Sequence, residues 1–280
     1  AVTVDSSANY CKAHPLSGGK QIVCESWRNL ISVGATPIAI TNCLNFGNPE
    51  NPKIMGEFAE SISGIKEACE FLDYPVVSGN VSFYNGTNKK NIYPTPVIGG
   101  VGLISNINNR MNHSFKKKNS HVLLIGKTFG HLHQSIFFEE IYSIKEGPPP
   151  EVNLLNEKNN SLSVLKLINN KLVLSAHDVS AGGIIVALAE MSMGHNFGIK
   201  IEKPKTLSNI FEYFYGEDQG RYIIEVEKSK LKEVKHVLKE NNIFNEKIGV
   251  TQEEYFELSD ELKMPINELY KINNKWYHNY

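Results

Sequence analysis

The chain has 280 residues, of which 41% are hydrophobic and 21% charged, and its formal net charge is −1 at pH 7. This length suits one large domain or two ordinary ones with a sizeable buried core. The near-neutral charge excludes a strong electrostatic footprint for nucleic acid or for an anionic membrane surface. No stretch is long and apolar enough to cross a bilayer, so we expect neither a membrane nor nucleic acid as a partner.

The cysteines indicate a reducing compartment rather than a metal site. Cys11, Cys24, Cys43 and Cys69 form no CxxC pair and lack the spacing of a zinc site. We therefore expect reduced, mostly buried thiols in a cytoplasmic protein. The N-terminus lacks the basic and apolar regions of a signal peptide. It has no initiator Met and opens on a predicted strand, which we interpret as the start of a segment cut from a longer chain.

Apolar spacing in the first block of the chain, residues 1–110, predicts two helices and three short strands. The helices are expected at 19–33 and 54–72, and the strands at 36–41, 75–78 and 96–104. A turn with two prolines is expected at 48–52. The segment 106–120, rich in Asn and Lys, reads as an exposed connection to a second block.

The second block, residues 120–258, mixes strands and helices in the same way. Strands are expected at 121–125, 172–176, 221–226 and 247–250. Helices are expected at 132–142, 161–168, 182–193 and 230–240. This mixture predicts an α+β or α/β class. The polar tail at 259–280, which contains Trp276, is interpreted as either a docking tail or a poorly ordered end.

A polar, asparagine-rich turn follows the predicted strand at 36–41. Asn42, Asn45 and Asn48 offer neutral oxygens and amide donors at a strand end, where ligands often meet backbone in mixed sheets. The same asparagines are also typical of a turn whose side chains bond their own backbone. The residues alone leave both interpretations open.

A second strand is expected to end at Gly79 and Asn80. Gly79 has no side chain, so a phosphate would approach its backbone closely. Asn80 supplies a carbonyl oxygen of the kind that magnesium accepts beside phosphate oxygens. Ser82 faces the same side as Asn80 if the chain stays extended. A β-bulge at Gly79, with Asn80 as a local cap, is the alternative.

Two further polar stretches flank the predicted helix at 182–193. Asp178 or Ser180 would cap this helix, and anion binding at its N-terminus is the alternative. In the stretch Glu217–Gln219, alternation places the outer two residues on one face and the middle one on the other. A solvated acidic turn is the plain interpretation of that stretch. The GxxxxGK[ST], GxGxxG, HExxH and GxSxG motifs are absent, so a nucleotide site would need a less common design.

Together these motifs are more specific than any one of them. Three runs of the first block resemble the second half of the large, synthetase subunit of the phosphoribosylformylglycinamidine synthase family: residues 34–49, 76–85 and 94–99. His177–Ser180 and Gly216–Arg221 continue the resemblance. It covers nearly all of residues 1–258.

The resemblance implies an α+β fold of two domains, as in aminoimidazole ribonucleotide synthetase. We expect a ferredoxin-like, dimerising N-terminal domain at 1–110, a second α+β domain at 120–258 and a tail at 259–280. The full family subunit carries two such units in tandem, and this chain resembles the second. The proton-transferring histidine and the His-Asn-His-Pro motif of the family belong to the first unit. We therefore assign no catalytic residue within this chain.

The activity implied by the resemblance is an ATP-dependent C–N ligation in purine biosynthesis. Formylglycinamide ribonucleotide, ATP and ammonia give formylglycinamidine ribonucleotide, ADP and phosphate, with Mg²⁺ as a cofactor. No glutaminase segment is visible, so ammonia is expected from a separate glutamine amidotransferase subunit, beside a small accessory subunit. The N-terminal half of the same enzyme is the remaining partner, without which we expect the isolated chain to be inactive.

Site residues are carried over by motif. Asn42 and Gly79 would contact ATP, Asn80 would bind magnesium, and Ser82 would contact the ribonucleotide substrate. Asn42 departs from the family, which usually has Asp there, and the amide keeps the shape but loses a negative charge. Ala181 is a second departure, at a position where an acidic or polar residue is more usual.

Two other functions stay open on the sequence. The first is a nucleotide-binding structural half that never turns over, which Asn42 mildly favours. The second is a homodimeric relative of aminoimidazole ribonucleotide synthetase, against which the runs 44–49 and 78–80 argue. Because the two halves of the family enzyme pair about a pseudo-twofold axis, a homodimer of the isolated chain is a further expectation.

Overall fold

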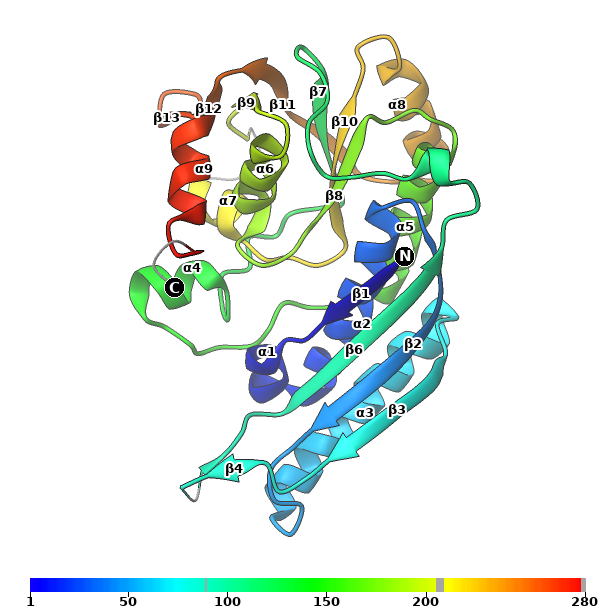
Figure 1. Ribbon diagram of the computed structural model, residues 1–280, viewed down its shortest axis with the longest axis vertical. Helices are drawn as coiled ribbons and strands as arrows, with labels where there is room; N and C mark the ends of the chain where they lie inside the picture. Colours follow the sequence, from blue (N-terminus) through cyan, green and yellow to red (C-terminus); the bar gives the residue numbers. More distant parts are fainter. Residues whose placement is uncertain (89, 205–208, 278–280) are drawn as a thin grey trace.

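The computed structural model describes residues 1–88, 90–204 and 209–277. The described chain forms a four-stranded sheet and a seven-stranded sheet, each with helices packed against it, and a small two-stranded ribbon, β4 (Gly86–Thr87) with β5 (Lys90–Asn91) (Figure 1). Sheets and helices are not arranged as alternating parallel units, because most strand pairs are antiparallel. The α+β class expected from the sequence is confirmed.

The first sheet has the strand order β1-β6-β2-β3. Its strands are β1 (Val2–Asp5), β2 (Thr36–Asn45), β3 (Val76–Ser82) and β6 (Thr95–Leu103). The helices of this part are α1 (Ala8–Ala13), α2 (Pro15–Ser32) and α3 (Pro52–Leu72), followed by the short 3-10 helix η1 (Ile107–Asn109). The pair β2–β3 is parallel, whereas β6 runs antiparallel to both β1 and β2.

Local sequence signals explain where α2 and α3 begin and end. Each helix starts with proline directly after a capping side chain, His14 before α2 and Asn51 before α3. Asp73 ends α3 in the left-handed conformation. The two helices pack very closely, because a Cβ atom on Gly64 would lie 2.0 Å from the carbonyl oxygen of Leu16.

The second sheet has the strand order β13-β12-β9-β11-β7-β10-β8. Its strands are β7 (His121–Ile125), β8 (Ser175–Val179), β9 (Phe197–Ile201), β10 (Arg221–Val226), β11 (Asn245–Glu253), β12 (Tyr255–Leu258) and β13 (Leu262–Pro265). Its helices are α4 (Ile136–Tyr142), α5 (Leu154–Asn169), α6 (Gly183–Met193), α7 (Ile210–Tyr215), α8 (Leu231–Glu240) and α9 (Ile266–Asn274).

The central strand β7 shows why the second sheet is covered on both faces. Leu123 and Ile125 point into a core formed with α5 and α8, while Val122 and Leu124 point into a second core formed with α6 and α7. All four side chains are fully buried. Because neighbouring strand residues face opposite sides, such an unbroken apolar run requires two covered faces.

Helix α2 joins the two parts of the molecule. It packs on α3 and β6 within the first part and on α5 and β8 within the second. One continuous hydrophobic core therefore runs from Trp27 and Leu30 on α2 to Leu165 on α5 and Ala176 on β8. The same contact buries Arg28, whose Nη1 donates to Glu157 Oε1 of α5 at 2.6 Å.

Several predicted elements need correction in extent. β2 and β3 run on to Asn45 and Ser82, well beyond the expected ends at 41 and 78, since polar residues continue the pairing with β6 and with each other. β9 and α7 are only five and six residues long and were not predicted. The tail is ordered through β13 and α9, with α9 packed on α6. No helix among the described residues is long and apolar enough to span a membrane.

The buried ion pair supports a first prediction. We expect Glu157→Ala to lower the free energy of unfolding by about 3–5 kcal/mol, because it leaves the guanidinium of Arg28 buried without its carboxylate. Urea denaturation of the full chain measures this change. Glu70→Ala is the matched control, since the Lys66–Glu70 pair is 68% and 67% exposed and is expected to contribute less than about 1 kcal/mol. Equal effects of the two variants would contradict the prediction.

Candidate functional site

The two motifs that the sequence singled out lie side by side on the parallel strands β2 and β3. Asn42 pairs with Gly79, Cys43 with Asn80, and Asn45 with Ser82. A Cβ atom on Gly79 would lie 2.0 Å from Asn42 Oδ1, so only glycine leaves room for this amide. The two motifs therefore lie next to each other, and they do so within the strands and not at the strand ends expected from the sequence.

The pairing divides the four candidate residues between the two faces of the sheet. Asn42 and Gly79 lie on the side of Ile98, which packs against the helices. Asn80 and Ser82 lie on the opposite, open side. The sequence placed Asn80 and Ser82 together correctly, but the alternation of an extended strand separates both from Gly79. The irregularity in pairing lies at Val77, so the alternative of a bulge at Gly79 is wrong.

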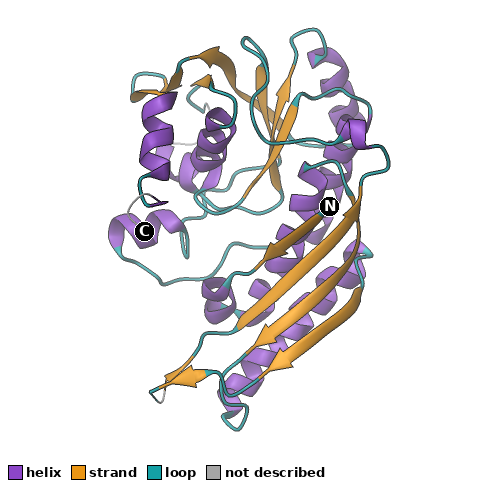
Figure 2. Cartoon of the chain, in the orientation of Figure 1, coloured by secondary structure: helices purple, strands orange, loops and turns teal. Residues whose placement is uncertain are grey.

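The open side of the first sheet combines a polar strip with an apolar area. The strip follows β2 and β3 and consists of Thr41, Cys43, Asn45, Ser78, Asn80 and Ser82. Beside it, on β1 and β6, lie the apolar side chains of Val2, Val4, Val101 and Leu103, which are between 46% and 81% exposed. Figure 2 shows these strands lying over α2 and α3, which cover only the opposite face. We refer to this side as the open face.

Turn chemistry fixes the loops beyond the strip. Asn48 Oδ1 accepts from the backbone N–H of Glu50, which confirms the turn interpretation for this asparagine. Asn85 Nδ2 donates to the backbone oxygens of Phe46 and Ser82 at 3.0 and 2.9 Å, and it ties the two strand ends together. The hydroxyl of Ser82 lies within 3.3 Å of Asn85 Oδ1. Ser82 is thus held in place by a neighbour that the sequence did not single out.

The donor set of the strip fits a metal held mainly by phosphate and water. It offers the amide oxygen of Asn80 and the hydroxyl of Ser82, and Mg²⁺ commonly takes only one or two protein ligands beside phosphates. Among the described residues, no group of three or more His, Cys, Asp or Glu side chains is placed to hold a metal ion. The strands β1, β2, β3 and β6 contain no lysine or arginine. A polyphosphate on the open face would therefore need positive charge from elsewhere.

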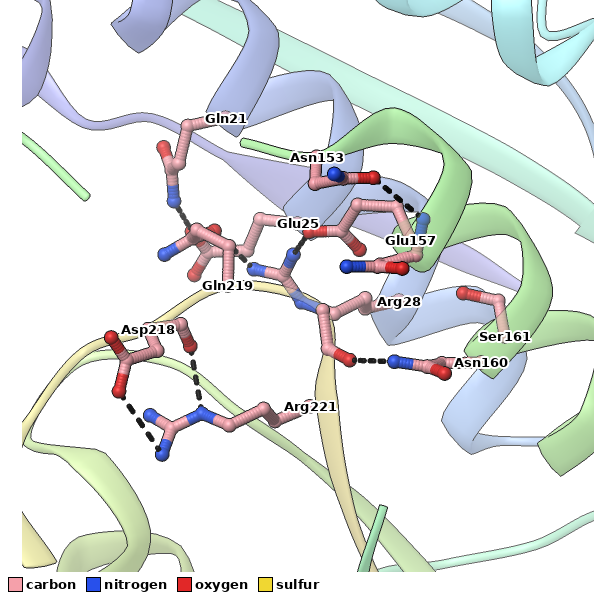
Figure 3. Close-up of polar contacts among 12 residues, drawn as sticks. Gln21, Glu25, Arg28, Asn153, Glu157, Asn160, Ser161, Asp218, Gln219 and Arg221 are labelled. Atoms are coloured by element: carbon pink, nitrogen blue, oxygen red, sulfur yellow. Dashed lines mark hydrogen bonds and ion pairs between the residues drawn. The ribbon is translucent and has the colours of Figure 1, made fainter. Parts of the chain in front are cut away.

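A buried polar network joins the first and second parts of the molecule behind this sheet. Arg28 on α2 donates to Glu157 and, through Nη2, to Gln219 Oε1 at 2.9 Å (Figure 3). Gln21 on the same helix donates to Glu25. Burial raises the pKa of Glu157, and the charge of Arg28 opposes this effect. Gln219, one of the residues singled out in the sequence, thus serves as a contact between the two parts.

Glu217 is a shared cap for two helices. Its Oε1 accepts from the N–H of Ile136, the first residue of α4, and from the N–H of Gly182, directly before α6, at 2.8 and 2.7 Å. Its Oε2 accepts from the hydroxyl of Tyr10 on α1. A carboxylate at a helix N-terminus satisfies free N–H groups and complements the helix dipole. The expected cap on α6 by Asp178 or Ser180 is wrong, because Gly182 occupies that position without a side-chain bond.

The expected solvated acidic turn is also wrong, because Glu217 and Asp218 are only 2% and 5% exposed. The carboxylate of Asp218 accepts from three successive backbone N–H groups, those of residues 129–131. Arg221 lies 3.7 Å from it and donates to the carbonyl oxygens of Gly216 and Asp218. The stretch is a buried loop whose charged side chains are all paired. Local sequence could not reveal this burial, because several of the partners come from distant segments.

Carboxyl groups gather where β1, α2 and β8 meet. Burial raises the pKa of Glu25 to about 7, against the charge of Arg28, and raises the pKa of Asp5 to about 6. Burial alone would lower the pKa of His177, but bonds to Asp178 and to Glu190 raise it to about 9. His177 in turn lowers the pKa of Asp178, although burial opposes this.

Comparisons with known proteins cover the whole chain. The model for the AIR synthase related protein, N-terminal domain, matches residues 1–104, and the model for the C-terminal domain of that family matches residues 117–260. Two curated relatives are the phosphoribosylformylglycinamidine synthase subunits PurL of Pelagibacter ubique (strain HTCC1062) and Bradyrhizobium diazoefficiens, 55% and 42% identical over 280 residues. The match covers 100% of this chain but only 38% of each relative, in their C-terminal part.

Solved structures share the fold at low sequence identity. Thermotoga maritima PurL complexed with ATP has a TM-score of 0.77 at 16% identity, and the same protein complexed with FGAR has 0.79 at 17%. The Thermotoga maritima PurLQS structure has a TM-score of 0.75 at 18% identity. The matches cover 96% of this chain and 44%, 45% and 44% of the other chains, respectively.

The buried carboxyl groups support a second prediction, on pH. Because the pKa of Glu25 is raised to about 7 in the folded chain, its contribution is complete below the unfolded value near 4.5 and is lost as pH rises through 7. We expect the free energy of unfolding to fall by about 2–3 kcal/mol from this group between those pH values. Glu25→Gln should flatten the profile, measured by urea denaturation at several pH values. An unchanged slope would count against this assignment.

Proposed function

The chain belongs to the AIR synthase related protein family, and from that premise we propose that it forms part of an ATP-dependent formylglycinamidine ribonucleotide synthase. The complete enzyme would convert formylglycinamide ribonucleotide, ATP and glutamine-derived ammonia into formylglycinamidine ribonucleotide, ADP and phosphate. Support comes from the PurL name of the curated relatives, at up to 55% identity over the full chain. The FGAR and ATP complexes of Thermotoga maritima PurL agree with these substrates.

The observation that carries the proposal is the composition of the open face. A polar strip with ligand-type oxygens lies beside bare apolar side chains, and none of the four strands supplies a positive charge. Exposed apolar area and missing positive charge are expected of one half of a binding site. A second protein surface would cover the apolar side chains and supply the charge. The chain spans about 38% of the length of its curated relatives, so that second surface would belong to the N-terminal half of the same enzyme.

We assign four residues, of which Asn80 and Ser82 lie on the open face and Asn42 and Gly79 on the opposite side of the same two strands. Asn80 would hold Mg²⁺ through its amide oxygen, and Ser82, held beside Asn85, would contact the ribonucleotide. Asn42 and Gly79 would contact ATP from the other side of the sheet, where Gly79, on the edge strand β3, leaves room for the amide of Asn42. None of these side chains is a proton donor or acceptor suited to catalysis, so the proton-transferring group would come from the completing half.

The reaction requires the protein to position its substrates, and it needs no covalent bond between the protein and a substrate. ATP phosphorylates the amide oxygen of the substrate, and ammonia then displaces phosphate to form the amidine. Bound Mg²⁺ would neutralise charge on the phosphates. The residues of this chain would orient the triphosphate and the ribonucleotide so that the reacting oxygen and phosphorus lie in line. A rigid sheet suits this task, since β2 is paired on both sides along most of its length.

The assembly would include further subunits. Ammonia would come from a separate glutamine amidotransferase subunit, with a small accessory subunit, as the PurLQS complex of Thermotoga maritima suggests by its composition. Such an assembly would work in the cytoplasm. This agrees with the free state of the four cysteines, three of which are buried.

A second function is favoured by Asn42. An amide in place of the family's usual carboxylate loses a charge that would help hold a metal–nucleotide complex, which suits a structural nucleotide site that never turns over. ADP that survives purification without exchange would support this alternative, and exchange at the rate of turnover would exclude it. A homodimeric enzyme related to aminoimidazole ribonucleotide synthetase is a third candidate.

A chimera tests the main proposal. We expect the Pelagibacter ubique subunit to retain synthase activity when these 280 residues replace its matched region, and Asn80→Ala in the chimera to lower the activity at least about tenfold. Formation of ADP that depends on formylglycinamide ribonucleotide and ammonia is the measurement. Asn159→Ala, an exposed asparagine on α5, is the matched control. An inactive but folded chimera, or equal activity of the two variants, would refute the proposal.

The open face gives a separate prediction about association. We expect the isolated chain to dimerise through the open face, because no described residue covers the exposed apolar side chains of β1 and β6 on that side. Val4→Glu should shift the chain to monomer, as measured by light scattering after gel filtration. Ile107→Glu, at a side chain 62% exposed outside the sheet, is the control and should leave the dimer intact. A wild-type chain that stays monomeric at high concentration would contradict this.

A further inference from the structure

A hollow of about 560 Å³ lies in the second part of the molecule, away from the β2–β3 strip. It is bounded by the loop at 129–133, the start of α5, helix α7 and the loop that contains Asp218 and Gln219. Asn153, directly before α5, and Gln219 both line it. The volume falls in the range of small-molecule sites. None of the residues assigned under the proposed function lines it.

Several polar side chains of the hollow have no hydrogen-bond partner among the described residues. Glu151, Asn156, Glu212 and His133 make no side-chain hydrogen bond or ion pair with any described residue. By contrast, the carboxylate of Asp218 is satisfied by three backbone N–H groups. Unpartnered groups that converge on one cavity are available to a ligand, and here acceptor oxygens predominate.

The charge of the lining selects against phosphate. No lysine or arginine occurs among the described residues that line the hollow, whereas Glu151 and Glu212 contribute free carboxylates. Arg221 lies 3.7 Å from Asp218 and offsets only that carboxylate. A phosphorylated ligand would therefore meet repulsion, while a neutral or cationic ligand with N–H donors would meet acceptors.

Aromatic side chains give the hollow a stacking surface. Phe129 is 73% exposed and lies at its rim, and Phe138 contributes a second ring to the lining. Phe129 makes no ring contact with another described aromatic side chain, so its face is free. The backbone N–H of Phe129 donates to Asp218, which fixes the position of this residue. An exposed ring on an anchored backbone favours a flat, aromatic ligand.

We propose that this hollow binds an unphosphorylated nitrogen heterocycle that carries an amino group. The ring stacks on Phe129, and the amino group donates to Glu212 or Glu151. The amide of Asn156 is placed to bond a ring nitrogen. The proposal is independent of the synthase function, because it uses no residue of the open face.

Three related probes test the proposal on the full chain by isothermal titration and by protein NMR. Adenosine should bind saturably, with a Kd of about 1 mM or tighter. AMP should bind at least about fivefold more weakly, because its phosphate meets the free carboxylates. Purine riboside, which lacks the amino group, should also bind at least about fivefold more weakly, since a carboxylate then loses its donor.

Matched variants locate the binding. Phe129→Ala should weaken adenosine binding by about fivefold or more through the loss of stacking, and it removes only an exposed side chain. Glu212→Gln should narrow the gap between AMP and adenosine, because it removes one negative charge. Glu70→Ala, at an exposed side chain outside both candidate sites, is the control and should leave adenosine binding unchanged.

Three outcomes would overturn the proposal. The first is no saturable binding of adenosine at about 10 mM, a concentration well above the expected Kd. The second is AMP binding as tight as adenosine binding to the wild type. The third is adenosine binding that Asn80→Ala removes and Phe129→Ala leaves intact, which would place the nucleoside on the β2–β3 strip.

Discussion

The buried contact between Arg28 and Glu157 is the interaction on which the arrangement of the two parts depends. Both side chains are at most 1% exposed, and the two residues lie 129 positions apart in the sequence, on different helices. Taking both charges out of water is costly, so the pair persists only because the surrounding core and Gln219 hold its geometry. The contact therefore contributes little net stability. It specifies how α2 packs, because the two charges are paired only when α2 lies against both α5 and β8.

Within the second part of the molecule, the loop at 216–221 likewise uses buried charged side chains to hold distant segments together. One carboxylate, Glu217, satisfies N–H groups at the starts of α4 and α6 and also accepts from Tyr10 of α1. The next, Asp218, organises the loop at 129–131. A short acidic stretch thus ties together segments from across the chain. Its residues also line two hollows: Glu217 lines one beside α1, and Asp218 lines the one at the start of α5.

The open face shows how function follows from what the fold leaves uncovered. Helices α2 and α3 bury one side of the first sheet, so the polar strip of β2 and β3 stays accessible on the other. The strip supplies neutral oxygens but no positive charge. A sheet of this kind can position a ligand, but it has no cationic side chain with which to activate one. This agrees with a role as one half of a composite site. The acidic, aromatic hollow has the opposite character and suits a different ligand.

The sequence by itself determined the mixture of strands and helices and the main helices, because apolar periodicity and strand-forming runs are local properties. Motif likeness narrowed the class to α+β, and the pairing of Asn42 with Gly79 came from the tertiary structure. Motif likeness also placed the chain in its family. Only the tertiary structure decided that Asn80 and Ser82 face away from Gly79, and that Glu217 is a buried cap and not a solvated acid. Those outcomes depend on strand pairing and on partners more than 30 residues distant, and local spacing carries no information about either.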